Sequence, residues 1–171
     1  MGLVFLLFSS GLLIFSFPKF DFWGLAWVGL IPLFFVLDGK TCKQAFRIPY
    51  ICGLFFFAGT LYWIGHVTVF GDILLILYLA LYFGFFGLGY SFFSWYKSSI
   101  KLFLLPSLWV VLEFIRDHAL SGFGWASLGQ SQYKNLWVIQ IADITGMFGV
   151  SFLVVMVNVF FKEFFTKNKH W

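Results

Sequence analysis

The stretch Trp109–Gln132, WVVLEFIRDHALSGFGWASLGQSQ, decides how the rest of the chain is interpreted, because charged and hydrogen-bonding groups concentrate in it. Glu113 and Arg116 are three residues apart, so on a helix they lie on one face and can interact. A lone charge in a hydrocarbon environment costs at least ~2.5–3.5 kcal/mol. We therefore interpret Glu113 and Arg116 as a mutually neutralising pair. Two glycines bracket an aromatic residue in Ser121–Trp125, which predicts that the chain leaves the helix there and forms a loop anchored by Trp125.

The composition places the chain in a membrane. Of its residues, 61% are hydrophobic and 11% are charged, whereas soluble domains carry about 25% charged residues. The fold class predicted from this is an all-α, polytopic transmembrane bundle that forms a single domain over residues 1–171. The net charge of +4 does not call for a nucleic-acid partner, because Lys and Arg in such a chain set the topology and meet anionic lipid headgroups.

Six apolar runs predict six transmembrane helices, although the first two are close to the lower length limit for spanning. The runs cover residues 3–17, 22–37, from Pro49 to about His66, 73–96, 102–116 and 144–165. The run 38–47 is expected to be a polar linker, and Pro49 to occupy the first turn of the third helix. Pro32 predicts a kink in the second helix. Gly84, Gly87 and Gly89 predict close helix packing in the fourth.

The positive charges predict the orientation. Alternate sides of the six spans carry eight and three of the eleven Lys and Arg residues. The richer side is cytoplasmic by the positive-inside rule. Both termini are then cytoplasmic, and the long loop at 117–135, between helices five and six, faces outward.

Candidate binding residues gather on the predicted outer face. They are Glu113, Arg116, Trp125, Gln130 and Gln132 from the long loop and its helix, with Tyr62, Trp63 and His66 from the end of the third span. Such a set can hold a phospholipid headgroup, with Arg116 on the phosphate. Alternatively, the aromatic residues form an interfacial belt and the two charges only neutralise one another. Both interpretations stay open from the sequence.

The sequence does not point to catalytic residues, a metal site or a cofactor. Two histidines, His66 and His118, lack a third spaced ligand. The two cysteines have neither the number nor the spacing of a disulfide framework or a zinc site. Cys42 lies in a basic linker and Cys52 in an apolar run, and neither has a base arranged beside it. We interpret both as structural.

Several separated motifs resemble the membrane half of bacterial apolipoprotein N-acyltransferase. They occur in order along nearly the whole chain: FSFPKFDFW at 15–23, YWI at 62–64, FG at 70–71, LEFIR at 112–116, SGFGW at 121–125 and LGQSQ at 128–132. The chain departs from the family pattern at Gly124, where proline is usual, and at Gln130, where tyrosine is usual.

The resemblance implies a bacterial inner-membrane enzyme that transfers an acyl chain from a phospholipid to the amino group of a lipoprotein's diacylglyceryl-cysteine. In that family a nitrilase-like domain with a Glu-Lys-Cys triad carries the chemistry, and this sequence does not contain it. We therefore expect the chain to be inactive alone, and either to need a separate nitrilase-like catalytic chain or to be a truncated product. The alternative is a non-enzymatic lipid-binding or scaffold membrane protein.

Overall fold

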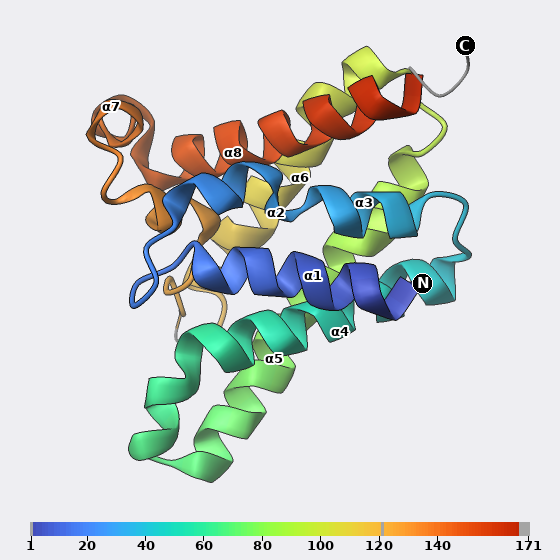
Figure 1. Ribbon diagram of the computed structural model, residues 1–171. Coiled ribbons are helices and arrows are strands. Elements are labelled where there is room, and N and C mark those ends of the chain that lie inside the picture. The colour runs from blue at the N-terminus through green and yellow to red at the C-terminus, as the bar shows by residue number, and fades with distance from the viewer. Residues whose placement is uncertain (1, 121, 168–171) are drawn as a thin grey trace.

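The computed structural model describes residues 2–120 and 122–167, and this part of the chain is helical without a strand (Figure 1). Its helices and short 3-10 turns, in chain order, are α1 Gly2–Phe15, η1 Trp23–Leu25, α2 Ala26–Gly29, α3 Ile31–Leu37, α4 Cys42–Leu61, η2 Tyr62–His66, α5 Val69–Phe93, α6 Ser98–His118, η3 Leu128–Gln132, α7 Leu136–Ile139 and α8 Ala142–Lys167. The prediction of a polytopic helical membrane bundle is confirmed.

Within the residues that the structure describes, four helical segments are long and apolar enough to cross a membrane: α4 with η2, α5, α6 and α8. The first two predicted spans are shorter. Helix α1 has 14 residues, which at a rise of 1.5 Å per residue gives about 21 Å, against about 30 Å for the hydrocarbon core of a bilayer. The second segment is divided into η1, α2 and α3. The bundle therefore combines four full-length helices with two short apolar ones.

The boundary predicted for the third span is wrong. Helix α4 begins at Cys42, so the linker is shorter than 38–47 and Pro49 lies inside the helix instead of in its first turn. The Thr41 amide donates to Gln44 Oε1 at 3.3 Å, so a capping interaction starts the helix before the proline. The turn at Pro49 packs closely on α5: a side chain at Gly87 would place its Cβ 1.9 Å from the Ala45 carbonyl oxygen. The close packing predicted for the α5 glycines is confirmed.

The second segment breaks beside Pro32, as predicted, and a buried amide stabilises the break. Asn158 of α8 is fully buried. Its Oδ1 accepts from the Leu30 amide at 2.9 Å, and its Nδ2 donates to the Ala26 carbonyl at 2.9 Å. Because backbone groups that lack helical partners must be satisfied inside a membrane protein, Asn158 is what makes the interruption between α2 and α3 tolerable.

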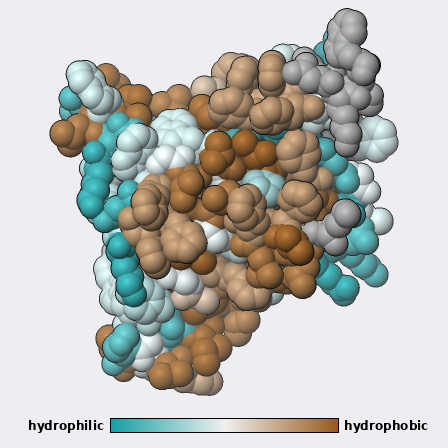
Figure 2. Space-filling view, in the orientation of Figure 1, coloured by the Kyte–Doolittle hydropathy of each residue, from teal (hydrophilic) through white to brown (hydrophobic). Residues whose placement is uncertain are grey.

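Polar groups lie at the two ends of the bundle, with hydrophobic side chains between them (Figure 2). One end, at the left of Figure 1, gathers the connection after α1, the turn between α4 and α5, and the segment from the end of α6 to α7. We call it the loop end. At the opposite end α1 begins and α8 finishes, and the α3–α4 and α5–α6 connections lie there. We call this the lysine-rich end, after Lys40, Lys43, Lys97 and Lys101.

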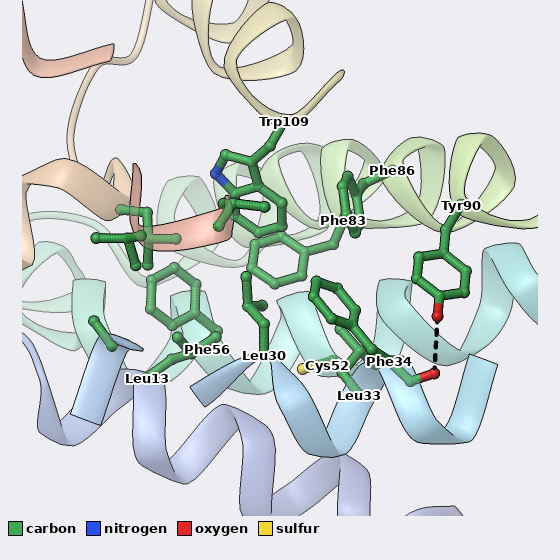
Figure 3. Close-up of a cluster of buried hydrophobic side chains, with 14 of the residues drawn as sticks. Leu13, Leu30, Leu33, Phe34, Cys52, Phe56, Phe83, Phe86, Tyr90 and Trp109 are labelled. Atoms are coloured by element: carbon green, nitrogen blue, oxygen red, sulfur yellow. Dashed lines mark hydrogen bonds between the residues drawn. The ribbon is translucent and has the colours of Figure 1, made fainter. Parts of the chain in front are cut away.

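A core of buried hydrophobic side chains, many of them aromatic, lies inside the bundle (Figure 3). Trp109 of α6 packs edge-on against Phe83 and Phe86 of α5, with ring centroids 5.1 and 4.9 Å away. Each such pair contributes about 0.5–1.5 kcal/mol beyond its area burial. One turn further along α6 from Trp109 is Glu113, so the core fixes the position of the first charged group.

Candidate functional site

The charged residues of α6 form a buried base for the long loop. Glu113 is 4% exposed, and its Oε1 accepts two hydrogen bonds, from Trp109 Nε1 at 2.9 Å and from the Leu128 amide at 2.7 Å. The first donor belongs to the same helix and the second to the loop. Hydrogen bonds to an ionised acceptor are about twice as strong as neutral ones. Glu113 therefore attaches the loop backbone to α6.

Arg116 attaches the same loop at a neighbouring residue. Its side chain is 3% exposed, its Nη2 donates to Ser127 Oγ at 2.5 Å, and its guanidinium lies 5.7 Å from the centre of the Phe57 ring. Ser127 Oγ in turn donates to the Gly124 carbonyl at 3.1 Å. Arg116 thus fixes the turn at 124–127 through one serine.

The prediction that Glu113 and Arg116 pair directly is wrong. In the described part of the chain no salt bridge joins them. Both line one small cavity, but each extends its terminal group toward a different loop residue, Leu128 or Ser127. The spacing of three residues places them on one helix face, as expected. Their hydrogen bonds, however, go to the loop and not to one another.

The loop lies against its neighbours closely enough to require glycine at two positions. Gly122 has φ +74°, and a Cβ there would lie 2.2 Å from the Asp117 carbonyl oxygen. A Cβ at Gly129 would lie 2.5 Å from the Met147 carbonyl oxygen of α8, and the Gly129 amide donates to Ser151 Oγ at 2.8 Å. Since both approaches are to backbone atoms that cannot move aside, Gly122 and Gly129 restrict the conformation of the loop on either side of Trp125.

An open cavity of about 360 Å³ lies at the loop end, above this buried base. Its walls come from the connection after α1, the α4–η2 junction and the long loop. Its polar and aromatic lining residues are Phe17, Lys19, Thr60, Tyr62, Trp63, Trp125 and Gln130. The rings of Trp63 and Trp125 lie 4.8 Å apart between centroids, and Lys19 Nζ lies 4.7 Å from the centre of the Tyr62 ring. Lys19 is the one charged residue among those described that line it.

Backbone strain gathers at this cavity. Lys19 has φ +91° and Ala126 has φ +60°, a region in which residues other than glycine are uncommon. Such positions cost about 1–3 kcal/mol each, and they cluster at binding and active sites. Lys19 and Ala126 lie in different segments, and both line the cavity.

A polar clip ties two of the walls together outside the cavity. Asp21 accepts from Tyr133 Oη at 2.6 Å through Oδ1 and from Lys134 Nζ at 2.6 Å through Oδ2. The hydrogen bonds from Lys134 and then Tyr133 lower the pKa of Asp21, and the bond to Asp21 raises the pKa of Lys134. Because Asp21 is engaged by Lys134, the carboxylate nearest to Lys19 in sequence already has a cationic partner.

The structure brings four of the predicted site residues together around the cavity: Tyr62, Trp63, Trp125 and Gln130. Gln130 also donates from Nε2 to the Gly124 carbonyl at 2.9 Å. Glu113 and Arg116 lie beneath the loop. The other two predicted residues, Gln132 and His66, are not in the cavity.

Gln132 is buried and connects η3 to η1 and α2 by hydrogen bonds. Its Oε1 accepts from Trp27 Nε1 and its Nε2 donates to the Trp23 carbonyl, both at 2.9 Å. His66 is exposed, with Nδ1 3.2 Å from the Trp63 carbonyl oxygen. Both residues therefore lie outside this cavity, and their assignment as binding residues stays a prediction. Lys19 and Thr60 line the cavity but were not selected from the sequence, although Lys19 was counted among the three positive charges of the predicted outer side.

Comparison with known proteins identifies the family. Residues 9–160 match the model of the apolipoprotein N-acyltransferase N-terminal domain. The chain belongs to this family. Curated relatives named apolipoprotein N-acyltransferase include one from Geobacter metallireducens, 40% identical over 88% of this chain and 31% of the relative. Others are from Chlorobaculum tepidum, 32% identical over 91% of this chain and 30% of the relative, and from Thermotoga maritima, 30% identical over 90% and 34%.

The chain spans about three tenths of the length of these relatives, 31% of the first and 30% of the second. It corresponds to the N-terminal membrane part of a family of lipoprotein-maturation enzymes, as the resemblance of its motifs predicted. The matched range contains the loop, the buried base and the cavity.

Proposed function

We propose that the cavity at the loop end holds the polar head region of a phospholipid of the outer leaflet, as the membrane part of an N-acyltransferase that acts on lipoproteins. The observation that carries this proposal is the lining of the cavity: one cation, two packed indole rings and two uncharged polar side chains, Thr60 and Gln130. A lipid headgroup presents a phosphate, ester oxygens and the start of an apolar chain, and each has a complementary group in that lining.

The chemistry of each lining residue gives it a role in the proposed lipid binding. Lys19 pairs with the phosphate, since an ammonium group is a compact point charge suited to it. Trp63 and Trp125 pack against the glycerol and the first methylenes, at the depth where indole rings are enriched. Gln130 donates to Gly124 through Nε2, so in this proposal its Oε1 accepts a hydrogen bond from a hydroxyl or ammonium group of the headgroup. Arg116, which the sequence favoured for the phosphate, positions the Trp125 loop from beneath instead.

In the proposed orientation the loop end faces outward from the bacterial inner membrane and both termini are cytoplasmic. The eight-to-three distribution of Lys and Arg supports this. The diacylated lipoprotein would approach from the same outer face, because its lipid chains lie in the same leaflet as the phospholipid.

Acyl transfer also needs a nucleophile with a base. Cys52 is buried in α4, and Cys42 begins α4 at the lysine-rich end, far along the bundle from the cavity. The reaction therefore needs a nitrilase-like part bearing the triad, on the same polypeptide or on a separate chain. The portion described by this structure supplies the lipid.

The experiment is phospholipid binding in nanodiscs, measured by photocrosslinking with a lipid that carries a diazirine at its headgroup. Lys19→Met removes the cation of the cavity, whereas Lys134→Met removes an exposed cation that Asp21 already engages. A charge-assisted hydrogen bond contributes about 1.5–3 kcal/mol, so Lys19→Met should lower crosslinking about tenfold at limiting lipid. Lys134→Met should change it little. Equal crosslinking by wild type and the Lys19 variant would overturn the proposed site.

A further inference from the structure

A second, much smaller cavity lies beneath the loop, between α5 and α6. Its volume is about 20 Å³. A space of about 10–15 Å³ or more on this measure is enough for one water molecule. Its walls include Phe83, Phe86 and Trp109, and its polar lining comes from Tyr82, Glu113 and Arg116. The aromatic walls leave room for a single small polar molecule and for nothing larger.

Two charged side chains that line this cavity each carry one buried polar atom without a hydrogen-bond partner among the described residues. Glu113 Oε2 and Arg116 Nε are buried, and neither has a hydrogen-bond partner within the described residues. The parent side chains are only 4% and 3% exposed. Leaving an atom of a buried charged group unsatisfied is costly, and such groups are commonly bridged by ordered water. The two atoms are complementary, since a carboxylate oxygen accepts and a guanidinium N–H donates.

We propose that one ordered water molecule occupies this cavity, accepting from Arg116 Nε and donating to Glu113 Oε2. Buried waters typically make about three hydrogen bonds. Tyr82 also lines the cavity, and its hydroxyl, which among the described residues contacts Tyr78 Oη at 2.6 Å, is the proposed third partner. The water site shares no lining residue with the phospholipid cavity, and the proposal does not rest on the proposed function.

This water completes the Glu113–Arg116 pair without direct contact. Glu113 Oε1 and Arg116 Nη2 remain on Leu128 and Ser127 of the loop, while the two remaining atoms share the water. The charges are then balanced across one molecule, and the hydrogen bonds to the loop are undisturbed. The water is a positioning element for the segment that carries Trp125 and Gln130.

The arginine content makes the site accessible to solid-state NMR in bilayers. The chain has only two arginines, Arg47 and Arg116, and Arg47 is exposed. Arg47→Lys therefore leaves one arginine, so that arginine-specific 15N labelling gives one Nε signal. Magnetisation transferred from water should reach that signal at short mixing times. The control is the side-chain amide of Asn158, labelled separately, which is fully buried and satisfied by Ala26 and Val154 carbonyls.

The expected result is transfer to Arg116 Nε at least several-fold faster than to the Asn158 amide. Leu112→Phe, which adds volume to the cavity wall, should slow that transfer to the rate of the control, and Phe83→Trp serves if the first variant does not fold. Equal rates at Arg116 and Asn158 in the folded wild type would overturn the water site. So would transfer that persists in both filled variants, or that originates from lipid protons instead of water.

Discussion

Two clusters of buried charge lie at opposite ends of this bundle, and they are built differently. At the lysine-rich end, Lys162 is 3% exposed and contacts Asp38 and Glu163, each at 3.0 Å. Glu163 also lies 3.7 Å from Lys101 and accepts from Ser98. At the loop end, Glu113 and Arg116 are equally buried but make no salt bridge with one another among the described residues.

The two clusters show that buried charged groups have two different structural roles in this membrane protein. The direct pairs at the lysine-rich end join the end of α3 and the start of α6 to α8, so they connect helices to helices. At the loop end, the charged groups of α6 bond to an amide and a hydroxyl of the loop, so they connect a helix to irregular backbone. Irregular backbone is tolerated at membrane depth only where the protein satisfies its hydrogen bonds. Charged groups that make these hydrogen bonds are therefore less able to form a salt bridge with one another.

The largest effect should follow from Glu113→Leu, which tests whether the loop depends on the carboxylate. The variant leaves three buried groups without their acceptor or counter-charge: Trp109 Nε1, the Leu128 amide and Arg116. Removing one member of a buried charged arrangement costs about 3–5 kcal/mol. We expect a loss of stability in that range, measured by chemical unfolding in detergent and followed by tryptophan fluorescence.

Glu113→Gln is the matched control, because its Oε1 can still accept from Trp109 and Leu128. It should lose clearly less stability than Glu113→Leu. If the two variants were equally destabilised, the negative charge and not the hydrogen bonds to the loop would be the important property, and the contrast between the two ends would weaken.

A pair of double-mutant cycles compares the two clusters directly. Residues in one network show coupling energies of about 0.5–3 kcal/mol. For Lys162→Met with Glu163→Gln, which are in direct contact, we expect a coupling of about 1–3 kcal/mol. For Glu113→Gln with Arg116→Met we expect less than about 1 kcal/mol, because each single change acts mainly through its own loop partner. Direct pairing at the loop end would instead have predicted that the double variant recovers stability.

The same measurement, thermal or chemical unfolding in one detergent, serves both cycles. A coupling at Glu113 and Arg116 as large as that at Lys162 and Glu163 would show that the two ends are built alike. The conclusion drawn from the separate contacts to Leu128 and Ser127 would then be wrong.

Much of the fold could be predicted because it depends on local patterns. Apolar runs locate the spans, Pro32 marks the interrupted segment, and the glycines of α5 mark a close approach. The predicted start of the third span was wrong because proline is common in the first turn of a helix. Here the capping interaction between Thr41 and Gln44 starts α4 before Pro49. A proline inside a membrane helix is tolerated where a neighbouring helix packs against the freed turn.

The site could be predicted only in part, because its partners are distant in sequence. Trp63 and Trp125 stand out as interfacial aromatics, but their contact depends on how α4 and the loop meet. Asn158 bonds to Leu30 across 128 positions, and Lys162 meets Asp38 only in the folded bundle. A lone Asn inside an apolar run, or a lone Lys near its end, has many ordinary explanations, so nothing local distinguishes these residues.

The smallest effect should come from the clip between Asp21 and Lys134, where the charges are exposed and solvent screening leaves little net stabilisation. Hydrogen bonds from Lys134 and Tyr133 lower the pKa of Asp21 below its ordinary value of 3.8. A carboxyl group with a lowered folded-state pKa stabilises the protein above its unfolded pKa, and the stabilisation is lost as the pH falls through the folded pKa. Lys134, whose pKa is raised from 10.5, stabilises the protein below its unfolded pKa and loses that stabilisation only as the pH rises through its folded pKa.

Asp21→Asn suits the test of this clip, because Asn tolerates the φ of +61° at this position. The variant should unfold slightly earlier than wild type at pH 7, and the two midpoints should converge as the pH falls below the ordinary Asp value. A difference that persists unchanged into that acid range would mean that the carboxylate charge does not stabilise the clip, and that the two walls of the cavity are held together by other contacts.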